Sequence, residues 1–168
     1  MKKALILLSV LGFIIFGYLF SEEAIPGQTE TKAPDFSLIT LDGDEISYSD
    51  YKGKVLFLNF WATWCGPCQV EIPDFIEVYD KLKKEGMEIL GVSLDRAGIE
   101  KVKKFVEEYR MNYPVAMANQ KIMNDYKPGR FIPTTIIIDR NGIIKHKHVG
   151  VMNKSLLIKY FNEFSETH

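Results

Sequence analysis

The sequence predicts an α/β domain in which a central mixed sheet is flanked by helices on both faces. The run "KVLFLNFWA" is almost continuously apolar, which is typical of a central strand covered on both sides. Helix and strand patterns alternate after this run, as expected when helices pack on one sheet. Two tight-turn dipeptides, Asp42-Gly43 and Asn141-Gly142, predict one β-hairpin before the central strand and another near the end of the chain.

The composition is that of one folded domain without a preference for charged partners. The 168 residues are 46% hydrophobic and 12% aromatic, which suits a globular protein rather than a disordered chain. Lysine and arginine total 21 against 22 acidic residues, so the sequence lacks the basic excess of nucleic-acid-binding proteins. We therefore expect no nucleic-acid partner.

Residues 1–21 predict an N-terminal membrane anchor or signal sequence. Residues 4–20 carry no charge, and as a helix they would span about 25 Å, close to the hydrocarbon thickness of a bilayer. Two lysines precede this segment and two glutamates follow it, which favours a cytoplasmic N-terminus and an exported remainder. Because no clear small-x-small cleavage site follows, a retained single-pass anchor in the cell membrane is favoured over a cleaved signal, which would leave a secreted or periplasmic protein.

Residues 22–32 predict a linker, and residues 33–168 predict the folded domain. The linker mixes charge with Pro26 and Gly27 and has no apolar periodicity. It would hold the domain on the extracytoplasmic side of the membrane. Disulfides persist in that compartment, which bears on the two cysteines of the chain.

The elements of the domain follow from local patterns. The stretch "FSLITLDGDEIS" alternates around its turn and predicts the first hairpin. Asn153 suits a helix cap, although Asn153-Lys154-Ser155 also matches a glycosylation acceptor. The other expected elements after the central strand are a helix over about 65–85, a strand in "MEILGVSLD", a helix over about 98–111, a short strand in "YPVAMA", a helix over about 119–126, strands in "TTIIID" and "IIKHKHV", and a helix over about 153–164.

Cys65 and Cys68 are the only cysteines, and their spacing fits several kinds of site. As a structural staple, the pair closes too small a loop to restrain the unfolded chain much. A zinc site needs two further ligands, whereas His146 and His148 are expected on the solvated side of an edge strand. Copper delivery through the two thiolates and one of these histidines is a non-enzymatic alternative.

A redox role explains more of the pattern around the cysteines. Cys65 falls where the central strand gives way to a helix, and Pro67 lies near the first helical turn, where its missing N–H costs nothing. Unpaired N–H groups and the helix dipole favour a thiolate at Cys65, which we expect to be exposed. Cys68, one turn further and shielded, can resolve a mixed disulfide formed by Cys65. Trp64 would partly cover the pair, or belong to the core. We expect a redox-active Cys65–Cys68 disulfide and no metal or other cofactor.

The motifs resemble those of the thioredoxin superfamily, which implies a thioredoxin-like fold. "WCGPC" after an apolar strand and "IPTT" before a later strand carry this resemblance. One branch, the membrane-anchored TlpA/ResA-like thiol–disulfide oxidoreductases, is similar over about residues 33–164. The resemblance implies an N-terminal β-hairpin and a central helix–strand insertion. The similar stretches are "APDFSLITLDG", "VLFLNFWATWCGPCQVEIP", the extra helix and strand before "YPV", "IPTTIIIDRNGII" and "HVGVM".

The resemblance also implies a substrate-binding surface. The Ile132–Pro133 bond would be cis and face the cysteines, the backbone of Ile132 would pair with a substrate peptide, and Pro133 would help to keep metals off the thiols. A proline that merely opens a strand is the alternative. We expect Trp64, Gly66 and Pro67 to contribute to the same surface.

Glu71 is a polar residue on a face that is otherwise apolar. With Phe75 and Val78 it follows helical spacing along the inward side of the helix after Cys68. A carboxylate there should be partly buried, with a raised pKa, and able to exchange protons near Cys68; the alternative is a boundary glutamate that bends out to water. TlpA/ResA-like proteins carry an active-site glutamate at this offset. Asn59 stands where thioredoxins have a buried aspartate that accepts a proton, which leaves Glu71 as the candidate for that task.

Together, the residues and the resemblance predict an extracytoplasmic thiol–disulfide oxidoreductase. Gly66-Pro67 is the dipeptide of thioredoxins, which are reducing at about −270 mV, and this favours reduction. TlpA/ResA-like proteins often have another residue at position 66. The expected partners are a disulfide-containing exported protein, with apocytochrome c during cytochrome maturation implied by the resemblance, and a membrane thiol electron donor.

Two other enzyme classes stay open. One is a thiol oxidase or isomerase, which shares the chemistry of the pair but not the direction of electron flow. The other is a peroxiredoxin-like enzyme, because "APDFSL" also resembles the start of that family. The Pro-x-x-x-Thr-x-x-Cys pattern of peroxiredoxins is missing before Cys65.

Overall fold

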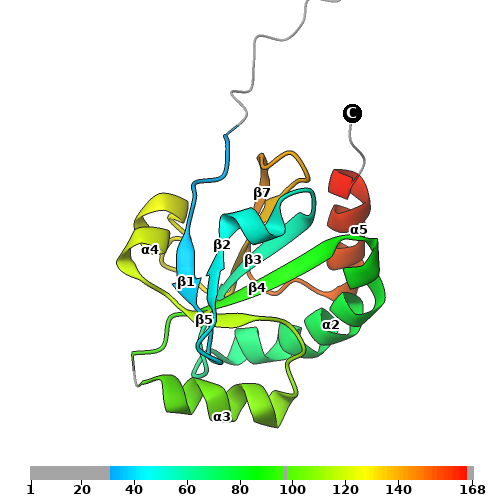
Figure 1. Ribbon diagram of the computed structural model, residues 1–168. Helices are drawn as coiled ribbons and strands as arrows, with labels where there is room; N and C mark the ends of the chain where they lie inside the picture. The colour runs from blue at the N-terminus through cyan, green and yellow to red at the C-terminus, as the bar shows by residue number, and fades with distance from the viewer. Residues whose placement is uncertain (1–30, 97, 166–168) are drawn as a thin grey trace, which may run out of the picture.

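The computed structural model describes residues 31–96 and 98–165, and its mixed α/β architecture confirms the predicted fold class (Figure 1). The main sheet has five strands in the order β5-β4-β3-β6-β7. β3 is central, runs parallel to β4 and antiparallel to β6, and β4–β5 and β6–β7 complete the sheet as a parallel and an antiparallel pair. The strands are β3 (Val55–Trp61), β4 (Met87–Ser93), β5 (Val115–Met117), β6 (Thr134–Ile138) and β7 (Ile144–Val149).

The predicted N-terminal hairpin is present as a small sheet of its own. β1 (Ser37–Ile39) and β2 (Glu45–Ser47) pair antiparallel. The hairpin is attached to the edge of the main sheet, because the backbone N–H of Leu41 donates to the carbonyl oxygen of Val115 at 2.9 Å. A 3-10 helix that the sequence did not predict, η1 (Tyr48–Tyr51), follows β2.

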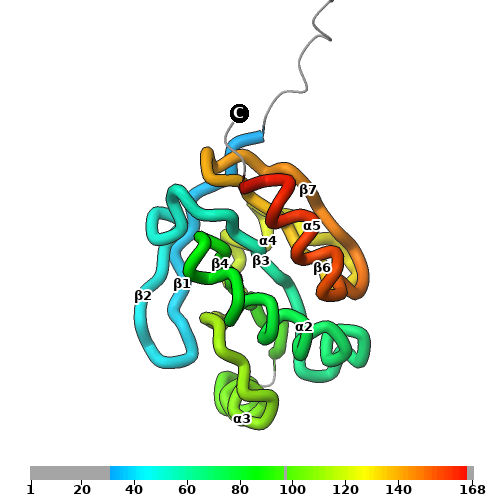
Figure 2. The backbone as a smooth tube through the Cα atoms, turned by 90° about the vertical axis from the view of Figure 1, so that its right-hand side faces the viewer, coloured from blue at the N-terminus to red at the C-terminus, as the bar shows by residue number. Residues whose placement is uncertain are grey.

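Helices cover both faces of the sheet, as predicted. α2 (Gly66–Leu82) and α5 (Lys154–Ser165) lie on one face, whereas α4 (Gln120–Tyr126) lies with the hairpin on the other (Figures 1 and 2). α3 (Ile99–Tyr109) contributes to the core on the α2 side. The predicted helix over 65–85 is α2 followed by the 3-10 helix η2 (Lys83–Glu85).

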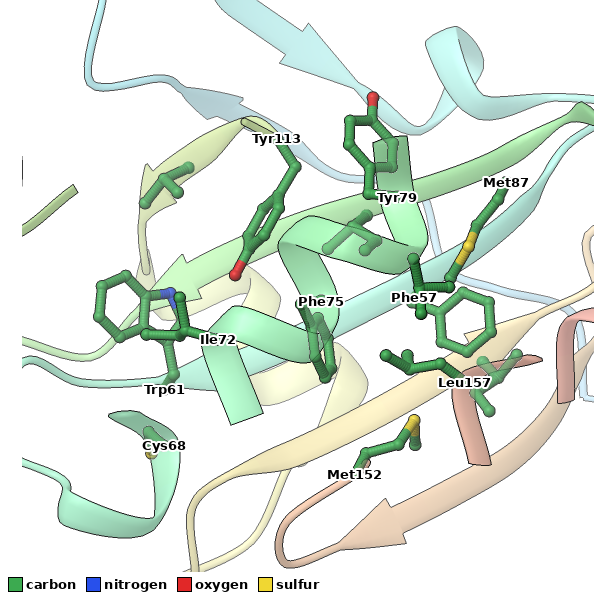
Figure 3. Close-up of a cluster of buried hydrophobic side chains, with 14 of the residues drawn as sticks. Phe57, Trp61, Cys68, Ile72, Phe75, Tyr79, Met87, Tyr113, Met152 and Leu157 are labelled. Atoms are coloured by element: carbon green, nitrogen blue, oxygen red, sulfur yellow. The ribbon is translucent and has the colours of Figure 1, made fainter. Parts of the chain in front are cut away.

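β3 supplies both hydrophobic cores, because alternate side chains of a strand point to opposite faces. Phe57 and Trp61 belong to the core beneath α2 and α5, and Leu58 belongs to the core beneath α4. Figure 3 shows the first core, with Phe57 and Phe75 at its centre and Cys68 at its edge. Every residue of β3 is buried, as predicted for a central strand covered on both sides.

The chain enters α5 through the predicted cap. The side-chain oxygen of Asn153 accepts a hydrogen bond from the N–H of Leu156 at 3.0 Å, which satisfies one of the free donors of the first turn. The structure therefore explains Asn153 as a capping residue.

The predicted anchor over residues 1–21 and most of the predicted linker over 22–32 lie outside the described residues. Within 31–96 and 98–165, no helix has the length and apolar character needed to cross a membrane. The anchor and the extracytoplasmic location stay predictions of the sequence.

Candidate active site

The two cysteines form a disulfide at the point where the loop after β3 enters α2. Cys65 is the N-cap residue of the helix, and Pro67 lies in its first turn, as predicted. The backbone N–H of Cys68 points at Cys65 and lies 3.2 Å from its Sγ atom. A free helical N–H in this position stabilises a thiolate, so the local geometry supports Cys65 as the attacking sulfur.

Cys65 is less accessible than the sequence suggested. Its exposed fraction in the disulfide form is 6%, against 0% for Cys68. The order of exposure agrees with an attacking Cys65 and a shielded Cys68, but Cys65 is not an openly exposed residue. Trp64 is 65% exposed, so the alternative that it belongs to the core is wrong, whereas Trp61 is a core residue at 1%.

The Ile132–Pro133 loop faces the disulfide, and the bond is cis, as the resemblance implied. The Sγ atom of Cys65 lies 3.6 Å from the carbonyl oxygen of Ile132. On its other side, the carbonyl of Pro133 accepts the N–H of Gly150 at 2.9 Å, which ties the loop to the turn after β7. The backbone of Ile132 is thus held beside the sulfur of Cys65.

Glu71 points into the core, so its surface alternative is wrong. Its exposed fraction is 1%. One carboxylate oxygen accepts the side-chain amide of Asn59 at 2.8 Å, and the other accepts the backbone N–H of Met152 at 2.8 Å. Glu71 lies three residues after Cys68, which places the two side chains on the same face of α2.

Burial moves the ionisation of Glu71 toward neutral pH. Burial disfavours the charged form and raises the pKa of the carboxyl group from 4.5 to about 7, although the hydrogen bonds from Met152 and Asn59 act in the opposite direction. An acid with this pKa is poised to exchange protons with a neighbouring thiol at neutral pH.

The side-chain amide of Asn59 holds Glu71 in place. Its side-chain nitrogen donates to Glu71 and also to the hydroxyl of Thr135, its partner across β3 and β6, at 3.0 Å. The sequence showed that Asn59 cannot accept a proton. It did not show that the amide is a donor that holds Glu71.

Gly66 is exposed at the start of α2, and its position has room for a side chain. Apart from its chain neighbours and the backbone of its own helix, a Cβ atom built there would have no heavy atom within 4 Å. The structure therefore accommodates the other residues that TlpA/ResA-like proteins carry at this position. The identity of residue 66 affects the surface beside Cys65 rather than the packing.

His146 and His148 are not arranged as metal ligands. As predicted, His146 and His148 share one side of the edge strand β7, but that side faces α5 and is half-buried rather than solvated. The ring of His146 stacks on Tyr160, and its Nε2 lies 3.0 Å from the hydroxyl oxygen of Tyr160. Across the described part of the chain, no three histidine, cysteine or acidic side chains gather as a metal site would require.

Three residues at the site were not anticipated from the sequence. Met152 holds Glu71 through its backbone N–H, which no side-chain pattern can reveal. Thr63 and the buried Asp95 bind each other beside the cysteine loop. The only sequence signal for Asp95 is its place two residues after the end of the apolar strand β4.

Comparison with known proteins agrees with this geometry. The AhpC/TSA family model matches residues 29–147. The chain is 41% identical over 151 residues to the thiol-disulfide oxidoreductase ResA of Geobacillus kaustophilus, covering 89% of this chain and 85% of the relative. It is 35% identical over 159 residues to ResA of Bacillus subtilis, covering 94% and 87%.

The chain belongs to the ResA-like thiol–disulfide oxidoreductases. Solved structures agree with this assignment. A thiol:disulfide interchange protein of the thioredoxin family from Chlorobium tepidum has a TM-score of 0.77 at 30% identity, covering 82% of this chain and 98% of that one. StoA from Bacillus subtilis has a TM-score of 0.66 at 26% identity, covering 76% and 96%. The protein is accordingly a thioredoxin-like disulfide oxidoreductase, with the Cys65–Cys68 disulfide as its redox-active group.

The pKa of Glu71 predicts a loss of stability as pH rises. Between pH 4.5 and about 7 the carboxyl group of Glu71 is ionised in the unfolded chain but protonated in the folded protein. Folding therefore takes up a proton, and the free energy of unfolding falls as the pH rises. The oxidised wild type should lose about 3 kcal/mol of unfolding free energy, relative to Glu71→Gln, between pH 4.5 and 8. Urea unfolding of both proteins across this range measures the difference.

Glu77→Gln is the matched control on the same helix. Hydrogen bonds from Lys154 and Lys81 lower the pKa of Glu77 to about 2, so in the folded protein it stays ionised between pH 4.5 and 8. Its stability curve should run parallel to that of the wild type. A Glu71→Gln curve that is also parallel would show that Glu71 ionises at its ordinary pKa.

Proposed function

We propose that this oxidoreductase reduces disulfides in proteins on the outer side of the cytoplasmic membrane. The surface around Cys65 is the observation that carries the proposal. Trp64, Val70 and Phe131 are 65%, 67% and 75% exposed, and they neighbour Cys65, Cys68 and the Ile132–Pro133 loop in the chain. Contiguous exposed apolar surface marks binding sites for macromolecules, and we propose that these three side chains form such a surface around the disulfide; a small disulfide would offer it little to contact. A polypeptide is therefore the favoured substrate.

The exchange proceeds through two attacks at sulfur. The Cys65 thiolate attacks one sulfur of the substrate disulfide, forms a mixed disulfide and releases the first substrate thiolate. The Cys68 thiolate then attacks Sγ of Cys65, forms the Cys65–Cys68 disulfide and releases the second substrate thiolate. Two electrons pass to the substrate, and a membrane thiol donor must return two electrons to regenerate the dithiol.

Glu71 supplies the proton acceptor for the second attack. Cys68 is fully buried and needs to lose its proton before it can attack. Glu71 follows on the same face of α2, and its pKa of about 7 lets it take that proton at neutral pH and release it afterwards.

Two features support reduction and the substrate class. The Gly66-Pro67 dipeptide is that of thioredoxins, which lie near −270 mV and reduce their substrates. The resemblance to ResA-like proteins favours the haem-binding CxxCH segment of apocytochrome c, or another exported disulfide protein, as substrate. A thiol oxidase or isomerase is the alternative, and the reduction potential of the isolated protein separates these directions.

Copper delivery and peroxide reduction receive less support. The ring of His146 is engaged by Tyr160, as described above. For peroxide reduction, the Pro-x-x-x-Thr-x-x-Cys motif of peroxiredoxins is missing before Cys65. Neither alternative uses the buried Glu71.

Location outside the cytoplasm is supported by the N-terminal sequence. Residues 4–20 are uncharged and long enough to span a bilayer, with lysines before them and glutamates after them. A structural neighbour from Streptococcus pneumoniae, with a TM-score of 0.68 at 30% identity over 77% of this chain and 99% of that one, is described as an exposed lipoprotein thioredoxin. We propose that this chain is held at the membrane by its own N-terminal segment.

Substitution of the resolving cysteine should trap the substrate. Reduced full-length Cys68→Ser, mixed with an oxidised CxxCH peptide from an apocytochrome c, should accumulate a mixed disulfide through Cys65, because no internal thiol is left to release it. Mass spectrometry with and without dithiothreitol detects the adduct.

The matched variant is Cys65→Ser, which should trap nothing. An adduct through Cys68 in that variant would contradict the assignment of the attacking sulfur. Reduced wild type is mixed with the oxidised peptide in the same way. If most of the peptide is still oxidised at equilibrium, reduction is not the favoured direction of exchange.

The N-terminal segment should place the domain outside. In intact cells, a membrane-impermeant maleimide should label Cys65 of the Cys68→Ser chain, and the protein should sediment with membranes. Deletion of residues 1–21 should leave the protein in the cytoplasm and unlabelled. Labelling only after cell lysis would refute an external domain, and a labelled but freely released product would refute the retained anchor.

A further inference from the structure

A second buried carboxylate lies beside the cysteine loop, on an element that the exchange steps do not use. Asp95 is the second residue after β4 and is 6% exposed. Its two oxygens accept three hydrogen bonds from side chains and backbone within the protein. A buried carboxylate is tolerated only when such donors satisfy it, so these contacts define its role.

Asp95 holds Thr63, which stands two residues before Cys65. One oxygen of Asp95 accepts the backbone N–H of Thr63 at 2.8 Å, and the other accepts its hydroxyl at 2.5 Å. The third donor is the hydroxyl of Ser93, at 3.0 Å. Two bonds to one residue fix both its position and its orientation.

The carbonyl of Thr63 is held by a residue that follows the cysteine pair in the sequence. The side-chain amide of Gln69, which follows Cys68, donates to this carbonyl at 2.8 Å. The hydroxyl of Tyr109 in α3 donates in turn to the side-chain oxygen of Gln69 at 3.3 Å. All three polar groups of Thr63 are therefore bound, by residues from the end of β4 and from α2, with α3 bracing Gln69.

We propose that Asp95 and Gln69 are positioning residues that hold the Thr63 loop so that Cys65 keeps its hydrogen bond from the N–H of Cys68. In the oxidised protein the disulfide itself fixes the sulfur of Cys65. Reduction removes that covalent link, and the fixed loop then keeps the sulfur at the helix N-terminus. The inference concerns the exchange reaction itself, whichever protein supplies the disulfide.

The direction of the effect separates positioning from simple electrostatics. As a mere negative charge, Asp95 would disfavour a thiolate nearby, and its neutralisation would make Cys65 ionise more readily. As a positioning residue, Asp95 keeps the N–H of Cys68 aimed at the sulfur, and its loss would make Cys65 ionise less readily. The two interpretations predict shifts of opposite sign.

The test uses the full chain with Cys68→Ser, which leaves one thiol and keeps the backbone N–H of residue 68. Rates of Cys65 alkylation by iodoacetamide are measured against pH in this background, alone and with Asp95→Asn, Thr63→Val or Gln69→Leu. Each of the three changes should move the midpoint of the profile upward by about one pH unit, which lowers the rate about tenfold at pH values well below both midpoints. Ser93→Ala, which leaves both bonds between Asp95 and Thr63 in place, is the matched control and should stay near the parent profile.

Far-UV circular dichroism establishes that each variant is folded before its profile is compared. Thr63→Val keeps the buried carboxylate and its backbone donor, so it carries the test if Asp95→Asn does not fold. A downward shift in Asp95→Asn would show a charge effect only and overturn the proposal. Unchanged midpoints in Thr63→Val and Gln69→Leu, or an equal shift in Ser93→Ala, would overturn it as well.

Discussion

The proposed proton transfer depends on one constraint, which is that the carboxyl group of Glu71 must be buried on the same face of α2 as Cys68 and still be able to ionise. If Glu71 were buried without hydrogen-bond donors, it would stay protonated far above neutral pH. If its side chain were exposed to water, it would be ionised over the whole neutral range. The protein meets the constraint with two donors, the amide of Asn59 from β3 and the backbone N–H of Met152 from the turn before α5. These donors partly offset the effect of burial, which leaves the pKa of Glu71 at about 7.

The same constraint explains the asparagine at position 59 and the fixed turn after β7. An acid at position 59 would place a second negative charge against Glu71, whereas asparagine supplies a donor, and Thr135 takes up its other N–H. The turn after β7 is fixed at one end to the carbonyl of Pro133 and at the other to Glu71. Glu71 and the Ile132–Pro133 loop are therefore joined through the turn after β7. The pKa of the neighbouring Tyr113 is raised, mainly by its burial and secondarily by the charge of Glu71, so its phenol stays neutral.

Much of this was predictable because it follows from periodicity. The apolar run of β3, the turn dipeptides and the entry of Cys65 into α2 are local patterns, and the inward direction of Glu71 follows from its helical spacing to Phe75. The contacts that tune the site are not local. Asn59 and Glu71 are 12 residues apart, and Glu71 and Met152 are 81 apart, with a backbone N–H as the donor in the second case. The cis bond before Pro133 could be expected only from the family resemblance, since residue types alone do not specify the isomer.

The titration of Glu71 itself tests this account most directly. Carbon-13 NMR of the full chain labelled at the glutamate carboxyl carbons, with Glu71 assigned by its absence in Glu71→Gln, follows the group through pH 4 to 9 in the oxidised protein. The account predicts a midpoint at about 7, because burial outweighs the two hydrogen bonds. A midpoint near 4.5, the ordinary value, would show that the carboxyl group is not tuned for proton exchange with Cys68 and would contradict the account.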